Sequence, residues 1–135
     1  MSVSVIIPAL NEEPTVAGVI RACLADDPLE VLVIDADSTD DTAAVARAAG
    51  ADVRNWRDIL PEPPRPGKGE SLWRGVAAAR GDIVVFIDAD LESAAPGMVT
   101  ALAAPFKDPG VNMVKARYRR SLNGQPTGGG RVTEL

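Results

Sequence analysis

The sequence contains no histidine and only one cysteine. Histidine is the commonest general base and a frequent metal ligand, so its absence leaves carboxylates, basic side chains and backbone groups as candidates for any chemistry. Cys23 has no partner for an internal disulfide and falls on an apolar helix face. We therefore expect a buried thiol in a protein of a reducing compartment.

Long hydrophobic runs are also missing. The first apolar run, Val3 to Ile7, stops at Pro8 and is too short for the core of a signal sequence, and no other run approaches the length of a membrane span. The formal net charge of -5 argues against nucleic-acid binding through overall electrostatics. We expect a cytoplasmic protein with no membrane span and no nucleic-acid partner.

The 135 residues, 46% of them hydrophobic, suffice for one compact domain. Short apolar runs alternate with helical patterns, which predicts an α/β fold: a mainly parallel sheet with helices on both faces. In the helix expected from Glu70 to Arg80, we predict a buried face of Leu72, Trp73, Val76 and Ala77. The expected strands are residues 3–7, 29–34, 51–54, 83–87 and 111–118; the other expected helices are 11–25, 41–49 and 96–106, and 55–69 is read as a long loop.

The most informative stretch is the apolar strand that ends in Asp88-Ala89-Asp90. In open parallel sheets ligands bind beyond the carboxyl ends of the strands, so acids at this position are expected in an active site. Residues two apart on an extended strand point to the same side, so Asp88 and Asp90 would converge if the strand continues. Paired carboxylates favour Mg²⁺ or Mn²⁺ over zinc. The alternative is a pair of solvated acids at a strand terminus.

Gly67-Lys68-Gly69 lacks the upstream glycine and the following Ser or Thr of a P-loop. Lys68 nevertheless lies between two glycines that would let the backbone approach a ligand. It is either a phosphate contact or a solvated loop lysine.

Several motifs together resemble the GT-A glycosyltransferases, and more narrowly the glucosyl-3-phosphoglycerate and mannosyl-3-phosphoglycerate synthases among them. The motifs occur along nearly the whole chain, in the family's order. They are Ile7 to Glu13, Ile34 to Thr42, Arg65 to Glu70, Phe86 to Asp90, Lys115 to Arg120 and Gly128 to Leu135.

This resemblance implies a GT-A fold, Rossmann-like, with residues 1–135 forming the nucleotide-sugar-binding part of the domain. It implies a retaining transfer of glucose from UDP-glucose, or mannose from GDP-mannose, to 3-phosphoglycerate. A homodimer is compatible with this expectation. Asp90 would bind Mg²⁺ or Mn²⁺, Asp88 would contact ribose or sugar, and Lys68 would reach the diphosphate. The remaining implied donor contacts are Pro8, Ala9, Leu10, Glu12, Ser38 and Ala89, and the implied acceptor contacts are Gly130, Arg131 and Thr133.

The chain departs from the family pattern in three ways. Ala89 stands where family members commonly have serine, and Asp37 stands where glycine is usual, so Asp37 would disturb the nucleotide or add a metal contact. Family members are also longer, and a histidine from their C-terminal half completes the metal site. We therefore expect the chain to be a donor-binding half whose C-terminal half is absent.

Two other functions are compatible with parts of the sequence. One is a non-catalytic nucleotide-sugar-binding domain. The other is a phosphatase of the haloacid dehalogenase type, in which Asp35 would be the nucleophile and Asp37 the general acid. That interpretation leaves the segment from Pro8 to Glu13 and the second pair of acids without a role.

Overall fold

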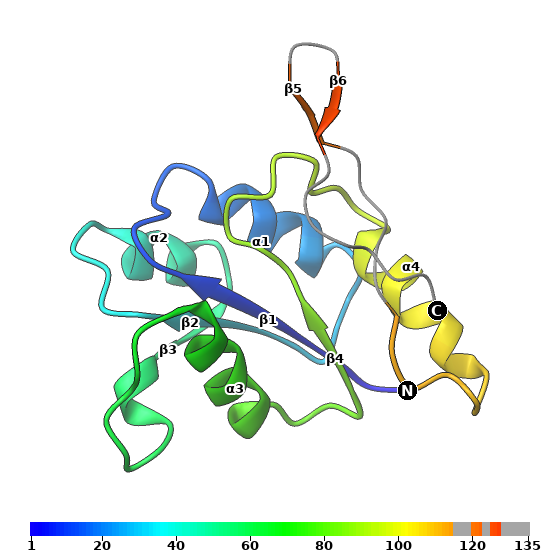
Figure 1. Cartoon of the computed structure of the whole chain (residues 1–135), viewed down its shortest axis with the longest axis horizontal. Helices are drawn as coiled ribbons and strands as arrows, with labels where there is room; N and C mark the ends of the chain where they lie inside the picture. Colours follow the sequence, from blue (N-terminus) through cyan, green and yellow to red (C-terminus); the bar gives the residue numbers. More distant parts are fainter. Residues whose placement is uncertain (115–119, 123–124, 128–135) are drawn as a thin grey trace.

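The computed structural model describes residues 1–114, 120–122 and 125–127. A four-stranded parallel sheet with the strand order β3-β2-β1-β4 forms its centre, as the sequence predicts (Figure 1). A separate antiparallel pair, β5 with β6, was not expected. The strands are β1 Val3–Ala9, β2 Glu30–Asp35, β3 Asp52–Asn55, β4 Ile83–Phe86, β5 Arg120–Leu122 and β6 Gln125–Thr127.

Helices cover both faces of the four-stranded sheet (Figure 1). The chain moves through β1, β2 and β3 in one direction and then returns to place β4 on the other side of β1, so right-handed connections put α3 opposite α1 and α2. The reversal creates a switch point beside β1, where ligands bind in folds of this type. The helices are α1 Val16–Leu24, α2 Thr42–Ala48, α3 Lys68–Ala78 and α4 Met98–Ala103, with the short 3₁₀ turns η1 Trp56–Asp58 and η2 Ala104–Lys107.

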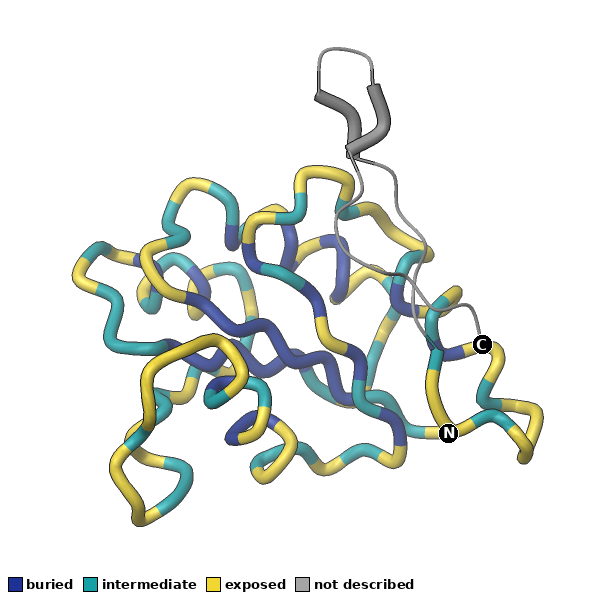
Figure 2. Tube along the Cα trace, in the orientation of Figure 1, coloured by how far each residue is buried: buried dark blue, intermediate teal, exposed yellow. Residues whose placement is uncertain are grey.

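Side-chain alternation along the strands divides the core into two clusters. Figure 2 shows that buried residues concentrate along the central strands of the sheet. Val5 and Ile7 point into the larger cluster beneath α1, which also contains the fully buried Cys23. Ile6 and Ile34 point into the smaller cluster on the face that α3 covers. Burial raises the pKa of the Cys23 thiol to about 11, with Asp26 adding to the shift, so the thiol is neutral and shielded as expected.

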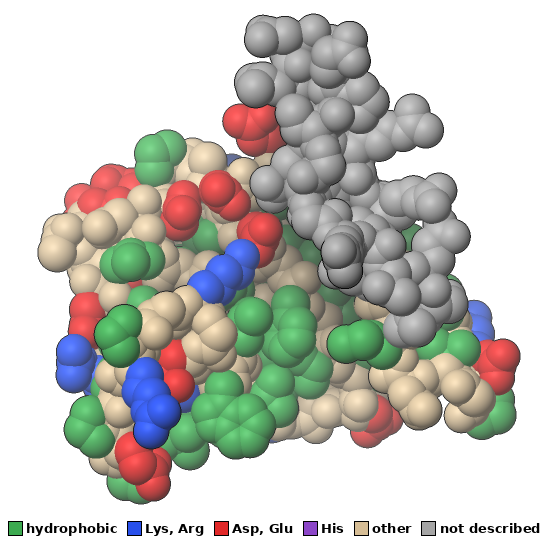
Figure 3. Space-filling model, in the orientation of Figure 1, with side chains coloured by type: hydrophobic (Ala, Val, Ile, Leu, Met, Phe, Trp, Pro, Cys, Tyr) green, Lys and Arg blue, Asp and Glu red, His purple; other side chains and the backbone are tan. Residues whose placement is uncertain are grey.

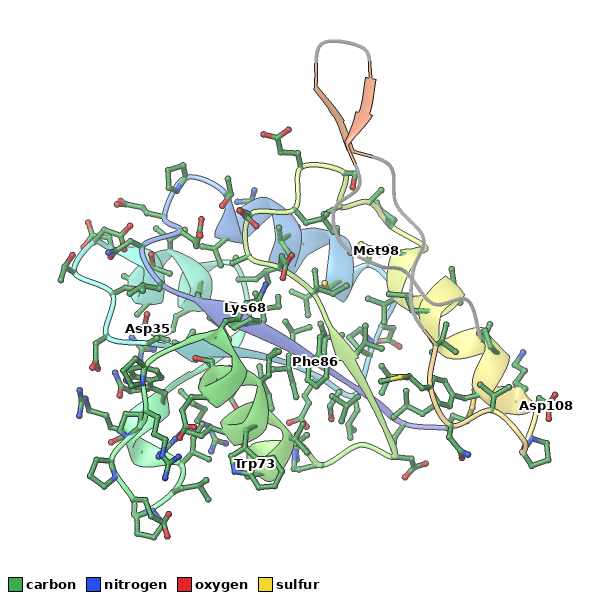
Figure 4. The ribbon with its side chains drawn as sticks, viewed as in Figure 1. Asp35, Lys68, Trp73, Phe86, Met98 and Asp108 are labelled. Atoms are coloured by element: carbon green, nitrogen blue, oxygen red, sulfur yellow. The ribbon has the colours of Figure 1, made fainter. Side chains whose placement is uncertain are left out.

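The predicted buried face of α3 is wrong. Trp73 is 64% exposed and Val76 is 42% exposed, whereas Ser71, Arg74 and Gly75 face the sheet. Trp73 and the exposed Phe86 of β4 appear on the open side of the molecule in Figure 4, and Figure 3 shows a strip of hydrophobic side chains over α3 and β4. The prediction assumed that the apolar side chains of a helix form its buried face. In α3 the buried face is formed instead by Gly75, which lets the helix backbone approach the sheet, and by the buried guanidinium of Arg74.

Gly75 allows α3 to approach the sheet. A Cβ at this position would lie 2.4 Å from Cγ2 of Ile6, a β-branched side chain held within the core. We therefore expect Gly75→Ala to lower the free energy of unfolding by about 1–3 kcal/mol, despite the better helix propensity of alanine. Urea denaturation followed by circular dichroism measures the change.

Gly18 in α1 provides the matched control. It is exposed, and a Cβ there would meet nothing within 4 Å. Gly18→Ala should therefore raise the free energy of unfolding by roughly 0.4–1 kcal/mol. Equal effects of the two substitutions would contradict the close packing described for Gly75.

Two predicted elements have different limits in the structure. The first helix begins at Val16 and not at Asn11, because Asn11 has a φ of 54° and its side chain binds the β2–α2 loop. The strand predicted over 111–118 has no strand in its described part, residues 111–114, and the rest lies outside the described residues. No helix in the part of the chain that the structure describes is long and apolar enough to cross a membrane.

Candidate functional site

A cavity of ≈ 240 Å³ lies at the carboxyl edge of the sheet. The segments that follow β1, β2, β3 and β4 all contribute to it, together with the first turn of α3. Its lining residues are Pro8, Ala9, Leu10, Glu12, Ala36, Trp56, Gly67, Lys68, Ser71, Asp88, Ala89 and Asp90. The sheet topology therefore brings together side chains that are far apart in the sequence, as expected for acids at the ends of parallel strands.

Asp88 and Asp90 lie on a turn and not on a continued strand. β4 ends at Phe86, and the amide of Leu91 donates to the carbonyl oxygen of Asp88 at 3.2 Å. Ala89 between the two acids is buried, and its carbonyl oxygen accepts a hydrogen bond from the Thr15 hydroxyl at 2.9 Å. The turn is thus fastened to the start of α1, and both carboxylates border the same cavity.

Lys68 at the start of α3 forms an ion pair with Asp88. Its side chain reaches toward the loop after β4 at the carboxyl edge (Figure 4). The two side chains are 57% and 45% exposed, so solvent screening leaves the pair worth only about 0–1 kcal/mol. Lys68 can therefore leave Asp88 for an anionic ligand at little cost.

The loops after β1 and β2 are bound to each other near the cavity. Asn11 Oδ1 accepts the amide of Thr39 at 2.8 Å, and the amide of Asn11 donates to the Ser38 hydroxyl at 2.9 Å. The amide of Glu12 donates to the buried Thr42 Oγ1 at 2.9 Å. These bonds hold the β1 loop in place, so that the segment from Pro8 to Glu12 presents a fixed wall to a ligand.

Asp37 is held away from the cavity. Its carboxylate accepts hydrogen bonds from Arg57 Nε at 2.8 Å and Asn55 Nδ2 at 3.1 Å, and its φ is 61°. The Arg57 guanidinium, followed by the donors of Asn55 and Trp56, lowers the pKa of Asp37 to about 2. Asp37 is not among the described residues that line the cavity, and its carboxylate is already paired with Arg57, so the extra metal contact stays a prediction that this arrangement does not favour.

Arg74 fixes the proline-rich loop against α3. Its side chain is 1% exposed and forms a salt bridge with Glu70 at 2.9 Å. The same guanidinium donates to the carbonyl oxygens of Trp56 at 2.8 Å and Leu60 at 3.3 Å, and to that of Glu62. Arg74 therefore positions the loop that carries Trp56 relative to the helix that carries Lys68.

The charges in the cavity suit a cation together with an anionic ligand. Glu12, Asp88 and Asp90 place three carboxylates there against the single ammonium of Lys68. Carboxylate oxygens are the ligands that hard divalent cations prefer. Among the described residues, however, no group of three or more potential metal-ligating side chains is close enough to hold an ion alone. Asp88 and Asp90 can thus supply part of a coordination shell.

Most of the predicted donor residues line the cavity. Asp90, Asp88, Lys68 and Glu12 do so, as do Pro8, Ala9, Leu10 and Ala89. Ser38 is absent from the described lining and instead binds the amide of Asn11. The predicted acceptor contacts Gly130, Arg131 and Thr133 lie outside the described residues.

Sequence reasoning missed Trp56, Ala36 and Ser71 of the lining, whereas Gly67 was noted as one of the two glycines beside Lys68. Trp56 directly follows β3, and Ala36 directly follows β2. Because ligands bind beyond the carboxyl ends of parallel strands, the position of these two residues directly after a strand could have predicted that they line the site. Ser71 lies three residues after Lys68, and this spacing places both on one side of α3.

A larger cavity of ≈ 590 Å³ lies at the opposite, amino edge of the sheet. Asp26 borders it and uses its carboxylate to accept the amides of Gly97 at 2.6 Å and Thr100 at 3.0 Å. Asp26 thus stabilises the start of α4. Asp27 and Lys107 also border this cavity, but it lies at the amino edge, whereas ligands of open parallel sheets bind beyond the carboxyl ends of the strands. We place the functional site in the smaller cavity.

The chain resembles known glycosyltransferases along most of its length. Residues 4–130 match glycosyl transferase family 2. The chain is 50% identical to the glucosyl-3-phosphoglycerate synthase of Mycolicibacterium paratuberculosis, over 99% of this chain and 44% of that protein. It is 42% identical to the corresponding enzyme of Petrotoga mobilis, over 100% of this chain and 45% of that protein.

The chain is also similar to solved structures of glucosyl-3-phosphoglycerate synthase. The crystal structure of glucosyl-3-phosphoglycerate synthase from M. tuberculosis superposes with a TM-score of 0.82 at 49% identity, covering 88% of this chain and 46% of that chain. A second structure of the enzyme, in complex with Mn²⁺, UDP-glucose and phosphoglyceric acid, has a TM-score of 0.82 at 48% identity and covers 87% and 44% of the two chains. The chain spans about half the length of the curated relatives it matches.

Proposed function

The chain belongs to glycosyl transferase family 2, and from this premise we propose that it forms the donor-binding part of a retaining glucosyltransferase. The donor is UDP-glucose and the acceptor is 3-phosphoglycerate. The bond between glucose C1 and the β-phosphate oxygen breaks, and a bond from C1 to the acceptor hydroxyl oxygen forms with the same anomeric configuration. The hydroxyl proton passes to the leaving diphosphate.

One observation carries this proposal: the cavity at the carboxyl edge places three carboxylates and Lys68 beside an apolar wall. The carboxylates of the cavity would repel a negatively charged diphosphate. Binding of the diphosphate therefore requires a cation between it and the carboxylates. Asp90 would hold Mn²⁺, the ion in the solved complexes of the relatives. The metal supplies charge neutralisation to the leaving diphosphate.

Residues of the chain perform the remaining steps of donor binding. Lys68 leaves its weak ion pair with Asp88 and binds the diphosphate, and Asp88 is then free to accept a hydrogen bond from ribose or sugar. Glu12 and the wall from Pro8 to Leu10 position the nucleoside. Gly130, Arg131 and Thr133 bind the acid groups of the acceptor.

Isothermal titration calorimetry tests the donor assignment. With Mn²⁺ present, UDP-glucose should bind at least ~10-fold more tightly than GDP-mannose, because the solved complexes of the relatives contain UDP or UDP-glucose. Without Mn²⁺, UDP-glucose binding should fall steeply. Equal binding of the two sugars, or binding that ignores the metal, would contradict this assignment.

Transfer and binding require separate measurements. Formation of glucosyl-3-phosphoglycerate from UDP-glucose and 3-phosphoglycerate would exclude the alternative of a non-catalytic nucleotide-sugar-binding domain. The phosphatase alternative is unsupported, because Asp37 is paired with Arg57 and the chain belongs to a glycosyltransferase family.

A further inference from the structure

The cavity has an apolar end and a charged end, and their order follows the order of the strands. Across the edge of the sheet, Trp56 follows β3, Ala36 follows β2, Leu10 follows β1, and Asp88 and Asp90 follow β4. Neighbouring strands are about 4.8 Å apart, so the two ends are separated by roughly 14 Å. This separation is comparable to the length of an extended nucleoside diphosphate.

Trp56 is held firmly at the apolar end. Its carbonyl oxygen accepts Arg74 Nη1 at 2.8 Å, and the ring packs against the core cluster of Ile6, Leu32 and Ile34. The residues on either side of it, Asn55 and Arg57, both bind the carboxylate of Asp37. Backbone and flanking side chains are therefore fixed before any ligand arrives, which lowers the entropic cost of binding.

The orientation of the indole leaves its ring, not its N–H, for a ligand. The Nε1 atom is buried and forms no hydrogen bond of normal geometry with a described residue, but it lies close enough to Asp37 to help lower the pKa of that carboxyl. The buried N–H is therefore not offered to a ligand, whereas Trp56 is among the residues that line the cavity.

We propose that Trp56 is a nucleobase-binding residue of the donor site, whose ring stacks on the base while the diphosphate lies at Lys68 and Asp90. This inference rests on the proposed function and extends it to a residue outside the motifs that carry the family resemblance. Stacking provides affinity for a planar base and none for the sugar or the diphosphate. A direct consequence is that only the base-containing ligand depends on Trp56.

Calorimetry with Mn²⁺ and either UDP or pyrophosphate tests the inference. Trp56→Ala should weaken UDP binding by about 5- to 100-fold, the range found when a stacked aromatic side chain is removed. Pyrophosphate binding should change less than about twofold. Trp56→Phe should retain most of the UDP affinity, because it retains an aromatic face.

A second measurement leaves Trp56 intact. The chain has two tryptophans, and the other, Trp73, is 64% exposed on the outer side of α3. In a Trp73→Phe variant all tryptophan fluorescence comes from Trp56, so UDP with Mn²⁺ should change the emission and pyrophosphate with Mn²⁺ should not. Trp73→Ala serves as the calorimetric control and should leave UDP affinity unchanged.

The outcomes separate this inference from the proposed function. A parallel loss of UDP and pyrophosphate binding in Trp56→Ala would show a merely structural role and overturn the inference, as would unchanged UDP binding or unchanged emission. Failure of the unmodified protein to bind UDP with Mn²⁺ would overturn the proposed function and, with it, the inference.

Discussion

Replacing Arg74 by methionine should lower the free energy of unfolding by about 3–5 kcal/mol, the scale for removing one partner of a buried ion pair. The substitution leaves the Glu70 carboxylate, which is only 20% exposed, without its cation. It also removes the donors from three carbonyl groups of the loop that carries Trp56. Chemical denaturation followed by circular dichroism measures the effect.

The matched control for Arg74 is Arg47, an exposed arginine on α2. Arg47→Met should change stability by less than about 0.5 kcal/mol. Arg74→Lys should be intermediate, because an ammonium keeps the charge but cannot reproduce the fork of donors that a guanidinium offers. Stability of Arg74→Met equal to that of the unmodified protein would show that the loop does not depend on this side chain.

Asp90→Asn should remove the metal-dependent part of UDP-glucose binding. The amide retains the size of the carboxylate but lacks its charge, and several kcal/mol of interaction with a divalent cation correspond to a loss of about two orders of magnitude in affinity. Because Asp90 is exposed at the rim of the cavity, the substitution should leave the fold intact. Calorimetric titration at a series of Mn²⁺ concentrations measures the loss.

Glu92 provides the comparison for Asp90. It is an exposed acid two residues further along the chain and is not among the described residues that line the cavity. Glu92→Gln removes the same charge from the same region and should leave the Mn²⁺ dependence unchanged. Equal effects of the two substitutions would show that Asp90 acts only through its negative charge and does not coordinate the metal directly.

The sequence was sufficient to locate the charged half of the site. The apolar run before Asp88 identifies a buried strand, and strands that alternate with helices require a shared carboxyl edge. This reasoning brought Asp88 and Asp90 to one place, and the structure gives them a common cavity. Glu12, which only the family resemblance implied, lines the same cavity. Lys68 was found from its flanking glycines, and it lies in the same cavity.

The apolar half of the site could not be found in the same way. Trp56 stands at the start of a proline-rich loop, where the sequence indicates little periodic structure, and its position depends on hydrogen bonds from Arg74, a residue of a later helix. Helical periodicity placed Trp73 inside and gave Arg74 no role. The structure reverses this arrangement because three carbonyl groups and Glu70 need the guanidinium.

Anomalous X-ray diffraction at the manganese edge, from crystals of the protein grown with Mn²⁺ and UDP, tests the central claim most directly. The account predicts an anomalous peak within coordination distance of an Asp90 carboxylate oxygen and of the diphosphate, with Lys68 Nζ on the diphosphate. Manganese bound away from Asp90, or UDP bound outside the cavity at the carboxyl edge, would contradict it.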